Sequence, residues 1–338
     1  MKNIRVIHLE TTPESLLGNI KKMEITDDRV YILENDRLEA LLVFDRHGKF
    51  LLNIGKKGRG PGEYYTINDF FINERDEEIA IYDGNMREIH HYDQDGHHLR
   101  THAFENNWLF ACHPLDSSRH ALDYTKRAGN RNPFHLRLVD SSGQAYFNYK
   151  PLKRDYYYAN NHHIAFYKAM NGLFYTPALC DTIFTLSPAG ITGGYAIDFG
   201  KQRLPEFFFD MLDKNEHATA LLKSSYCHRI RNVLETERLL SFNFGFGSIE
   251  LCLFYDKLTG ETFQNIQFLP PPRASRGNLL AGTFNSENLH TLVHNMPEAY
   301  IEQWKNVLGA DNWQLLTEIS LGDNPLLFFY DITPPPAE

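Results

Sequence analysis

The sequence predicts an all-β fold, a single-domain six-bladed β-propeller spanning residues 1–338. Three observations support this prediction. A short hairpin motif recurs along the chain, its glycines are almost evenly spaced, and both ends of the chain contain a strand-like run with no hairpin partner nearby. Phe occurs 24 times and Tyr 18 times, and such aromatic residues favour β-structure.

The recurring motif is an apolar run, then Asp or another polar residue, then a turn that ends in Gly. Copies end at Gly48, Gly96, Gly143, Gly190 and Gly260. Gly tolerates positive φ and Asp caps tight turns, so each copy predicts a β-hairpin. Successive glycines are 48, 47, 47 and 70 residues apart, and a period in the forties is typical of propeller blades. Five marked hairpins and one unmarked carboxy-terminal unit give six blades, and the long interval predicts an insertion.

Short apolar runs bounded by turn residues predict the strands in order. Blade one is expected at 23–26, 29–34, 41–45 and 50–54, and blade two at 69–73, 78–82, 88–92 and 98–104. The alternating aromatic run 242–247 predicts a strand whose Phe side chains pack between blades. The runs 4–9 and 326–332 predict that the first strand completes the last blade, which removes two exposed sheet edges.

Two segments depart from the β-pattern. Apolar residues recur at helical spacing over 205–223 and 297–308, and each segment begins near a proline. We expect two short helical insertions there. Each caps a blade edge or fills a loop, or else forms a lid or a partner surface on one face of the propeller.

Charge and cysteine usage narrow the function classes. The formal net charge of −9 excludes the basic footprint of a nucleic-acid-binding protein, and no apolar run approaches the length of a membrane span. We expect a monomer. Cys112, Cys180, Cys227 and Cys252 form no CxxC motif, and we expect isolated buried thiols, although three disulfide pairings are possible. The first ten residues do not resemble a signal peptide, so the protein is cytoplasmic or a leader has been removed.

Several motifs resemble those of a known family. Residues 54–64 read IGKKGRGPGEY, similar to the GxGPGEY linker between the first two blades of six-bladed propellers abundant in Bacteroidetes. Residues 181–184, DTIF, resemble the DTIY segment of that family, and residues 197–201, IDFGK, resemble its IDFGK segment. The resemblance covers essentially the whole chain. It implies an NHL-like propeller, often an exported lipoprotein of the periplasm or cell surface, and it carries over no catalytic residues.

The candidate ligand-binding residues lie on the glycine-rich linker and on an aromatic segment. The linker lacks the features of a phosphate loop and is expected to cross between blades, although an Arg and a Glu on a rigid loop could orient a polar ligand. Exposed tyrosines beside Asn and His suit stacking on sugars or protein recognition. The candidates are Arg59, Glu63, Tyr64 and Asp69, with Tyr156, Tyr157 and Tyr158 as secondary choices.

Two function classes follow. The first is a binding module of the cell envelope for a protein, peptide or glycan, without a cofactor, and the absence of catalytic motifs favours it. The alternative is a calcium-dependent lactonase or hydrolase with its site at the propeller axis, where several blades supply oxygen ligands. The candidate ligands are Glu63, Asn68, Asp69, Asn107, Asp181 and Asn243. Adjacent histidines such as His90 and His91 point to opposite faces of a strand, and His98 and His102 share a face only if their strand is regular.

Overall fold

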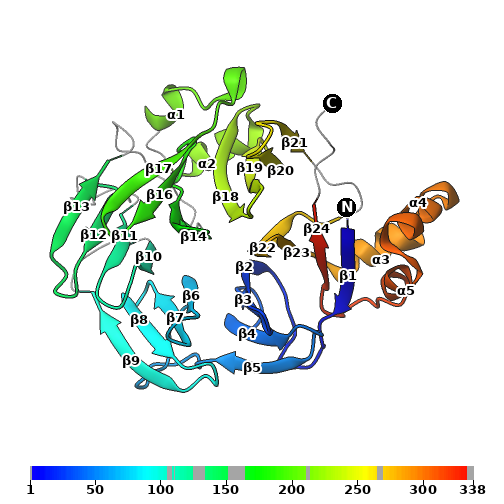
Figure 1. The fold of residues 1–338 in the computed structure, drawn as a ribbon, viewed down its shortest axis with the longest axis horizontal. Helices are drawn as coiled ribbons and strands as arrows, with labels where there is room; N and C mark the ends of the chain where they lie inside the picture. The colour runs from blue at the N-terminus through cyan, green and yellow to red at the C-terminus, as the bar shows by residue number, and fades with distance from the viewer. Residues whose placement is uncertain are drawn as a thin grey trace.

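A computed structural model of the chain confirms the six-bladed β-propeller. It describes residues 2–104, 109, 111–124, 134–150, 164–210, 214–264 and 269–332. Six four-stranded antiparallel sheets stand around a common axis, and within each sheet the first strand lies nearest that axis (Figure 1). Each sheet is one blade, numbered here in chain order from the blade that begins with β2.

The first three blades follow one another without interruption in the strand order. Blade 1 contains β2 (Ile20–Ile25), β3 (Arg29–Glu34), β4 (Ala40–Asp45) and β5 (Phe50–Ile54). Blade 2 contains β6 (Asp69–Asn73), β7 (Glu78–Asp83), β8 (Glu88–Tyr92) and β9 (His98–Ala103). Blade 3 contains β10 (Ala111–Pro114), β11 (His120–Asp123), β12 (Leu136–Val139) and β13 (Ala145–Tyr149). The strands of blades 1 and 2 match the prediction to within three residues at each end.

The last three blades complete the ring. Blade 4 contains β14 (Phe166–Ala169), β15 (Gly172–Tyr175), β16 (Thr182–Ser187) and β17 (Gly190–Ala196). Blade 5 contains β18 (Cys227–Glu235), β19 (Leu239–Phe246), β20 (Ile249–Asp256) and β21 (Thr262–Gln264). Blade 6 contains β22 (Pro272–Arg276), β23 (Leu279–Phe284), β24 (Leu326–Asp331) and β1 (Lys2–His8).

The repeated hairpin motif works as predicted. Oδ1 of Asp45, Asp93 and Asp140 each accepts hydrogen bonds from the backbone N–H groups two and four residues further on, at 2.8–3.0 Å. The glycine of every copy has positive φ, for example 89° at Gly48 and 83° at Gly96. In these three turns the Asp side chain and the glycine together hold the connection between the third and fourth strands of the blade.

The amino-terminal strand closes the ring. β1 pairs antiparallel with β24 and forms the outer strand of blade 6, with Val6 opposite Phe328 and His8 opposite Leu326. Both ends of the chain therefore leave the same blade (Figure 1). This is the closure that the unpartnered end strands predicted.

The two helical insertions are present, and the second is longer than expected. The first contains a 3₁₀ turn (Gly200–Gln202), α1 (Phe207–Asp210) and α2 (Lys214–Lys223). The second contains α4 (Glu298–Leu308), as predicted, and also α3 (Ser286–His294) and α5 (Ala310–Thr317). Asn285 begins α3 by accepting hydrogen bonds from two backbone N–H groups, and Gly309, with φ of 84°, separates α4 from α5.

Helix α5 covers the outer edge of blade 6. Asn312 accepts a hydrogen bond from the Val6 N–H at 2.9 Å and donates one to the Ile4 carbonyl at 3.0 Å. These are backbone groups on the free side of β1, so the side chain of Asn312 pairs with an edge that would otherwise be open. Of the roles considered for this insertion, edge capping is the one these contacts support.

The hydrophobic core lies between neighbouring blades. Phe242 and Phe244 of β19 are buried against residues of blade 4, which confirms the packing predicted for the aromatic run. The four cysteines are free and buried. In the described part of the chain no helix is long and apolar enough to cross a membrane.

The antiparallel order of the strands gives the propeller two different faces. One face, called the turn face here, has the tight turns between first and second strands, such as 74–77 and 115–119, and those between third and fourth strands. The opposite face has the connections between second and third strands and the crossovers between blades. Both helical insertions are connections of this second kind, so they belong to the face opposite the turn face.

Candidate functional site

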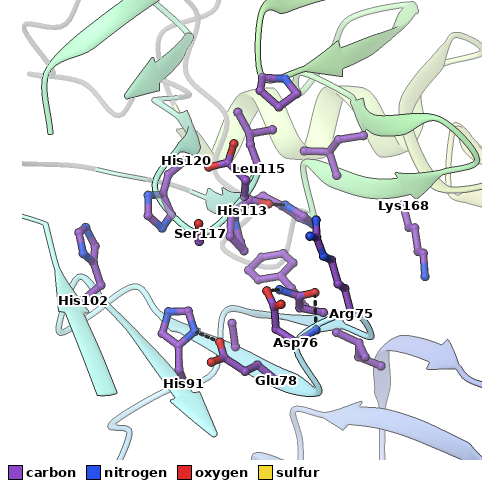
Figure 2. A pocket seen from close by; sticks show the side chains of 18 of the residues that line it. Arg75, Asp76, Glu78, His91, His102, His113, Leu115, Ser117, His120 and Lys168 are labelled. Atoms are coloured by element: carbon purple, nitrogen blue, oxygen red, sulfur yellow. Dashed lines mark hydrogen bonds and ion pairs between the residues drawn. The ribbon is translucent and has the colours of Figure 1, made fainter. Parts of the chain in front are cut away.

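A pocket on the turn face is the candidate functional site. Its volume is about 660 Å³, and blades 2, 3 and 4 all contribute to its walls. The turns after β6 and β10 and the turn before β17 form its rim. Figure 2 shows the side chains of these elements gathered around one hollow. Its polar lining includes Glu24, Arg75, Asp76, Glu78, His91, Arg100, His102, His113, Asp116, Ser117, His120 and Lys168.

Four histidines from four consecutive strands line this pocket. They are His91 on β8, His102 on β9, His113 on β10 and His120 on β11. Burial lowers the pKa of His91 and of His120 to about 4 and that of His113 to about 3, and it also lowers the pKa of His102. All four side chains are therefore neutral imidazoles near pH 7, each with one N–H donor and one acceptor nitrogen.

A charged cluster holds His91 in place. Arg100 donates two hydrogen bonds to the Glu78 carboxylate, at 2.5 and 2.6 Å, and its Nη2 lies 3.2 Å from Nδ1 of His91. The same Nδ1 lies 3.3 Å from Oε2 of Glu78. The Arg100 guanidinium holds the pKa of Glu78 below its usual range. A bidentate pair of this kind fixes orientation as well as charge, and both of its members contact Nδ1 of His91.

His102 and His120 form a second element of the wall. Their rings are stacked, with centroids 4.9 Å apart and planes 17° from parallel. His120 is 6% exposed, and its Nδ1 finds no hydrogen-bond partner among the described residues. A buried polar atom without a partner is uncommon in folded proteins and requires a specific explanation. A ligand that brings hydrogen-bonding groups into the pocket would supply a partner for Nδ1 of His120.

The strand geometry decides which histidines meet. His90 and His91 are neighbours on β8 and lie on opposite faces of the blade, as predicted. β9 has a register shift, because His91 pairs with Arg100 whereas Tyr92 pairs with His98. The strand is therefore irregular, and His98 falls on the face of His90 while His102 falls on the face of His91. Of these four histidines, His91 and His102 line the pocket, whereas His90 and His98 do not.

Ion pairs connect four blades beside the pocket. The carboxylate of Glu74 lies 2.6 Å from Nζ of Lys168 in blade 4 and 2.7 Å from Nη1 of Arg276 in blade 6. Arg276 also pairs with Asp27 of blade 1 at 2.9 Å. Lys168 also lines the pocket, as does Glu24 on β2 of blade 1, so this chain of charges borders the pocket where the innermost strands meet.

The linker residues predicted as a site lie away from this pocket. Oε2 of Glu63 accepts a hydrogen bond from the Gly60 N–H at 2.9 Å, and a Cβ at Gly58 would come within 1.9 Å of the same oxygen. Tyr64 is buried between blades 1 and 2. The guanidinium of Arg59 is exposed and lies 5.0 Å from the ring of Tyr65. Glu63 thus folds back on its own loop, and the glycines of the motif make room for it.

Asp69 lies in the core beside the axis. It is 2% exposed, and its Oδ1 lies 3.0 Å from Nζ of Lys22, which also lies 3.0 Å from Glu24. The ammonium group of Lys22 thus forms ion pairs with the carboxylates of both Asp69 and Glu24. Burial raises the pKa of Asp69, whereas in Lys22 the two carboxylates outweigh burial and raise its pKa. Tyr156, Tyr157 and Tyr158 lie outside the described residues.

The predicted calcium ligands have other partners where the structure describes them. Asn68 accepts a hydrogen bond from the Gly84 N–H at 2.7 Å, Asp181 pairs with Arg203 at 2.7 Å, and Asn243 donates to Glu250 at 2.6 Å. Asn107 lies outside the described residues. Among the residues that are described, no three His, Cys, Asp or Glu side chains are grouped so that they could hold a metal ion.

The fold defines the class of protein: a six-bladed β-propeller with a histidine-lined pocket on its turn face. Within that class, the chain belongs to the family described as "Domain of unknown function (DUF4934)", whose model matches residues 1–331. No curated protein matches the chain.

Two solved structures share the fold along nearly the whole chain. One is a "putative exported protein" of Bacteroides fragilis NCTC 9343, with 20% identity, a TM-score of 0.80, and coverage of 98% of this chain and 95% of the other. Another is a member of the DUF4221 family from Bacteroides vulgatus ATCC 8482, with 10% identity, a TM-score of 0.60 and coverage of 98% of each chain. At these identities the similarity shows the fold alone.

Proposed function

We propose that the protein is a binding module whose ligand is a carbohydrate held in the histidine-lined pocket. The observation that carries this proposal is the gathering of four neutral imidazoles in a pocket whose acidic and basic side chains are mostly paired with each other. Sugar hydroxyls both donate and accept hydrogen bonds, and neutral imidazoles do the same. A peptide would instead require the pocket to satisfy backbone groups along an extended edge or groove.

The size of the pocket supports the same proposal. Ligand sites are usually concave and have volumes of roughly 300–1,000 Å³. The volume of about 660 Å³ lies within this range and suits a short oligosaccharide. Leu115, Leu173 and Pro188 add apolar surface to the walls, against which the C–H faces of sugar rings can pack. Blades from a rigid ring hold all these groups, so little ordering would be needed on binding.

We also propose that the protein acts in the periplasm or at the cell surface. This proposal is supported by the similar fold of the B. fragilis protein described as a putative exported protein. Fractionation of the native host with an antibody against the chain tests it. Recovery with the envelope fractions is expected, and recovery only with the cytosolic fraction would contradict it.

Replacing Ser117 with Trp should abolish carbohydrate binding without unfolding the protein. Ser117 is exposed on the turn after β10 and lines the pocket, so an indole there would occupy ligand space. The neighbouring Ser118 is also exposed but does not line the pocket, which makes S118W a matched control. Titration calorimetry against a panel of neutral and acidic oligosaccharides is the measurement, with peptides as a second panel.

The expected result is that at least one oligosaccharide binds the wild-type protein and S118W, and that S117W binds it at least tenfold more weakly, which corresponds to about 1.4 kcal/mol. Thermal unfolding of both variants serves as the folding control. Equal binding by S117W and S118W would place the ligand elsewhere. Binding of peptides but of no sugar would contradict the ligand class.

A further inference from the structure

We infer that the carbohydrate bound in this pocket is acidic, and that Arg75 binds its carboxylate. This inference rests on the proposed function, because it names the ligand class of the same pocket. It follows from an inventory of the charged side chains in the walls.

Most charged groups in the walls already have an opposite charge beside them. The paired groups are Glu24 with Lys22, Glu78 with Arg100, Asp116 with Arg119, and Lys168 with Glu74, at 2.5–3.0 Å. None of these groups therefore offers a ligand a charge without an opposite charge beside it. Recognition of a charged ligand must therefore come from a group outside these pairs.

Arg75 is such a group. It lies on the turn between β6 and β7 and lines the pocket, and it is exposed. It makes no ion pair with any residue that the structure describes. Figure 2 shows its side chain reaching from that turn into the hollow.

The neighbouring carboxylate, that of Asp76, does not form an ion pair with Arg75. Asp76 is on the same turn, but its Oδ2 accepts a hydrogen bond from the Asn73 side-chain amide at 2.8 Å, and its own N–H faces Asn73 Oδ1 at 3.3 Å. Asp76 is therefore engaged within the turn. The guanidinium of Arg75 stays outside any ion pair with the described residues, while the Asp76 carboxylate beside it accepts its hydrogen bond from the Asn73 side chain of the same hairpin.

A free guanidinium among neutral imidazoles favours a specific chemistry. The planar fork of an arginine matches a carboxylate, to which it can donate two parallel hydrogen bonds. The chain as a whole has a net charge of −9, which repels anions, so binding of an anionic ligand depends on a local cation that is not already paired. Hydroxyl groups and a carboxylate occur together in uronic acids. The inferred ligand is thus an oligosaccharide that contains a uronic acid.

The test compares acidic sugars with their neutral counterparts on matched variants. Two sets of sugars are titrated into the wild-type protein, R75Q and R59Q. The first set contains oligouronides of galacturonic, glucuronic, mannuronic and guluronic acid. The second set contains the same oligomers after reduction of their carboxyl groups. Arg59 is an exposed arginine on the linker outside the pocket, so R59Q removes the same charge elsewhere. Binding is measured by calorimetry at low and at moderate salt.

We expect an oligouronide to bind wild type and R59Q about tenfold more tightly than its reduced form, and we expect R75Q to lose this preference. The preference should also weaken as salt is raised. Equal binding of both forms, or an unchanged preference in R75Q, would overturn the role of Arg75 and leave the proposed function standing. Loss of the preference only in R59Q would move the acidic site to the linker. Binding of no sugar in either form would overturn the proposed function as well.

Discussion

Replacing Lys22 with methionine is expected to destabilise the fold by about 3–5 kcal/mol. The Lys22 ammonium is buried and lies 3.0 Å from both Asp69 and Glu24, and it donates a 2.7 Å hydrogen bond to the carbonyl of Phe70. Its removal would leave the Asp69 carboxylate uncompensated inside the core, where the desolvation cost of a charge is highest. Urea unfolding at pH 7.5 measures the loss, and K49M, at an exposed position, should change stability by no more than about 0.5 kcal/mol.

A second variant, K22M/D69L, distinguishes the loss of the Lys22–Asp69 ion pair from a simple loss of packing. In K22M/D69L both charges are replaced by apolar groups, so the double variant should be more stable than K22M alone. If the double variant is less stable than K22M, the ion pair does not explain the effect. Ligand binding by K22M/D69L also tests the site prediction for Asp69, since the buried carboxylate is then absent.

The effect of K22M should depend on pH. Burial raises the folded-state pKa of Asp69 above its ordinary value of 3.8, so the folded protein holds this proton more tightly than the unfolded chain. The contribution of Asp69 to stability is therefore most favourable below that value and declines as pH rises through the folded pKa. Without Lys22 the folded pKa rises further. The difference between wild type and K22M should thus be smaller at pH 4 than at pH 7.5, and an equal difference at both would contradict this account.

Replacing Asp83 with alanine is the second large effect, and we expect a loss of at least about 3 kcal/mol. Asp83 is fully buried at the end of β7, and its carboxylate accepts hydrogen bonds from the N–H groups of Tyr65 and Thr66 in the linker. It also accepts from the N–H groups of Asn85 and Met86 in the next turn. Alanine would leave four backbone donors without this partner, and the linker would lose its attachment to blade 2.

Asp45 provides the matched control. It also accepts hydrogen bonds from two backbone N–H groups, but in an exposed turn where water can replace the carboxylate. D45A should therefore lose only about 1 kcal/mol. Thermal and urea unfolding of the two variants compare the two positions. If D83A and D45A are destabilised equally, burial of the Asp83 network does not add to its strength.

Much of the fold could be predicted because its signals are local and repeated. The Asp and Gly of each hairpin act within five residues of one another, so they predict a turn without knowledge of the rest of the chain. Evenly spaced turns then predict the blades. The second helical insertion is longer than predicted because helical spacing of apolar residues predicts only 297–308, although Asn285 provides an N-cap signal for α3.

The pocket could not be predicted in the same way. His91, His102, His113 and His120 come from four strands of two blades, and no spacing in the sequence connects them. A register shift in β9 decides that His102 reaches the pocket while His98 does not. Adjacent histidines are visible in the sequence, but which neighbour faces the pocket depends on how the strands pair. The conspicuous linker motif, by contrast, marks a place where glycines accommodate Glu63.

The closure of blade 6 has a consequence for how the protein is made. β1 leaves the ribosome before the other strands of the propeller, yet its partner β24 begins at Leu326. For most of synthesis β1 has no strand to pair with, and the ring cannot close before β24 has emerged. Such long-range pairing folds slowly. The ring of the nascent chain should therefore remain open until β24 has emerged, and every product that terminates before β24 should carry an incomplete blade that associates with other chains.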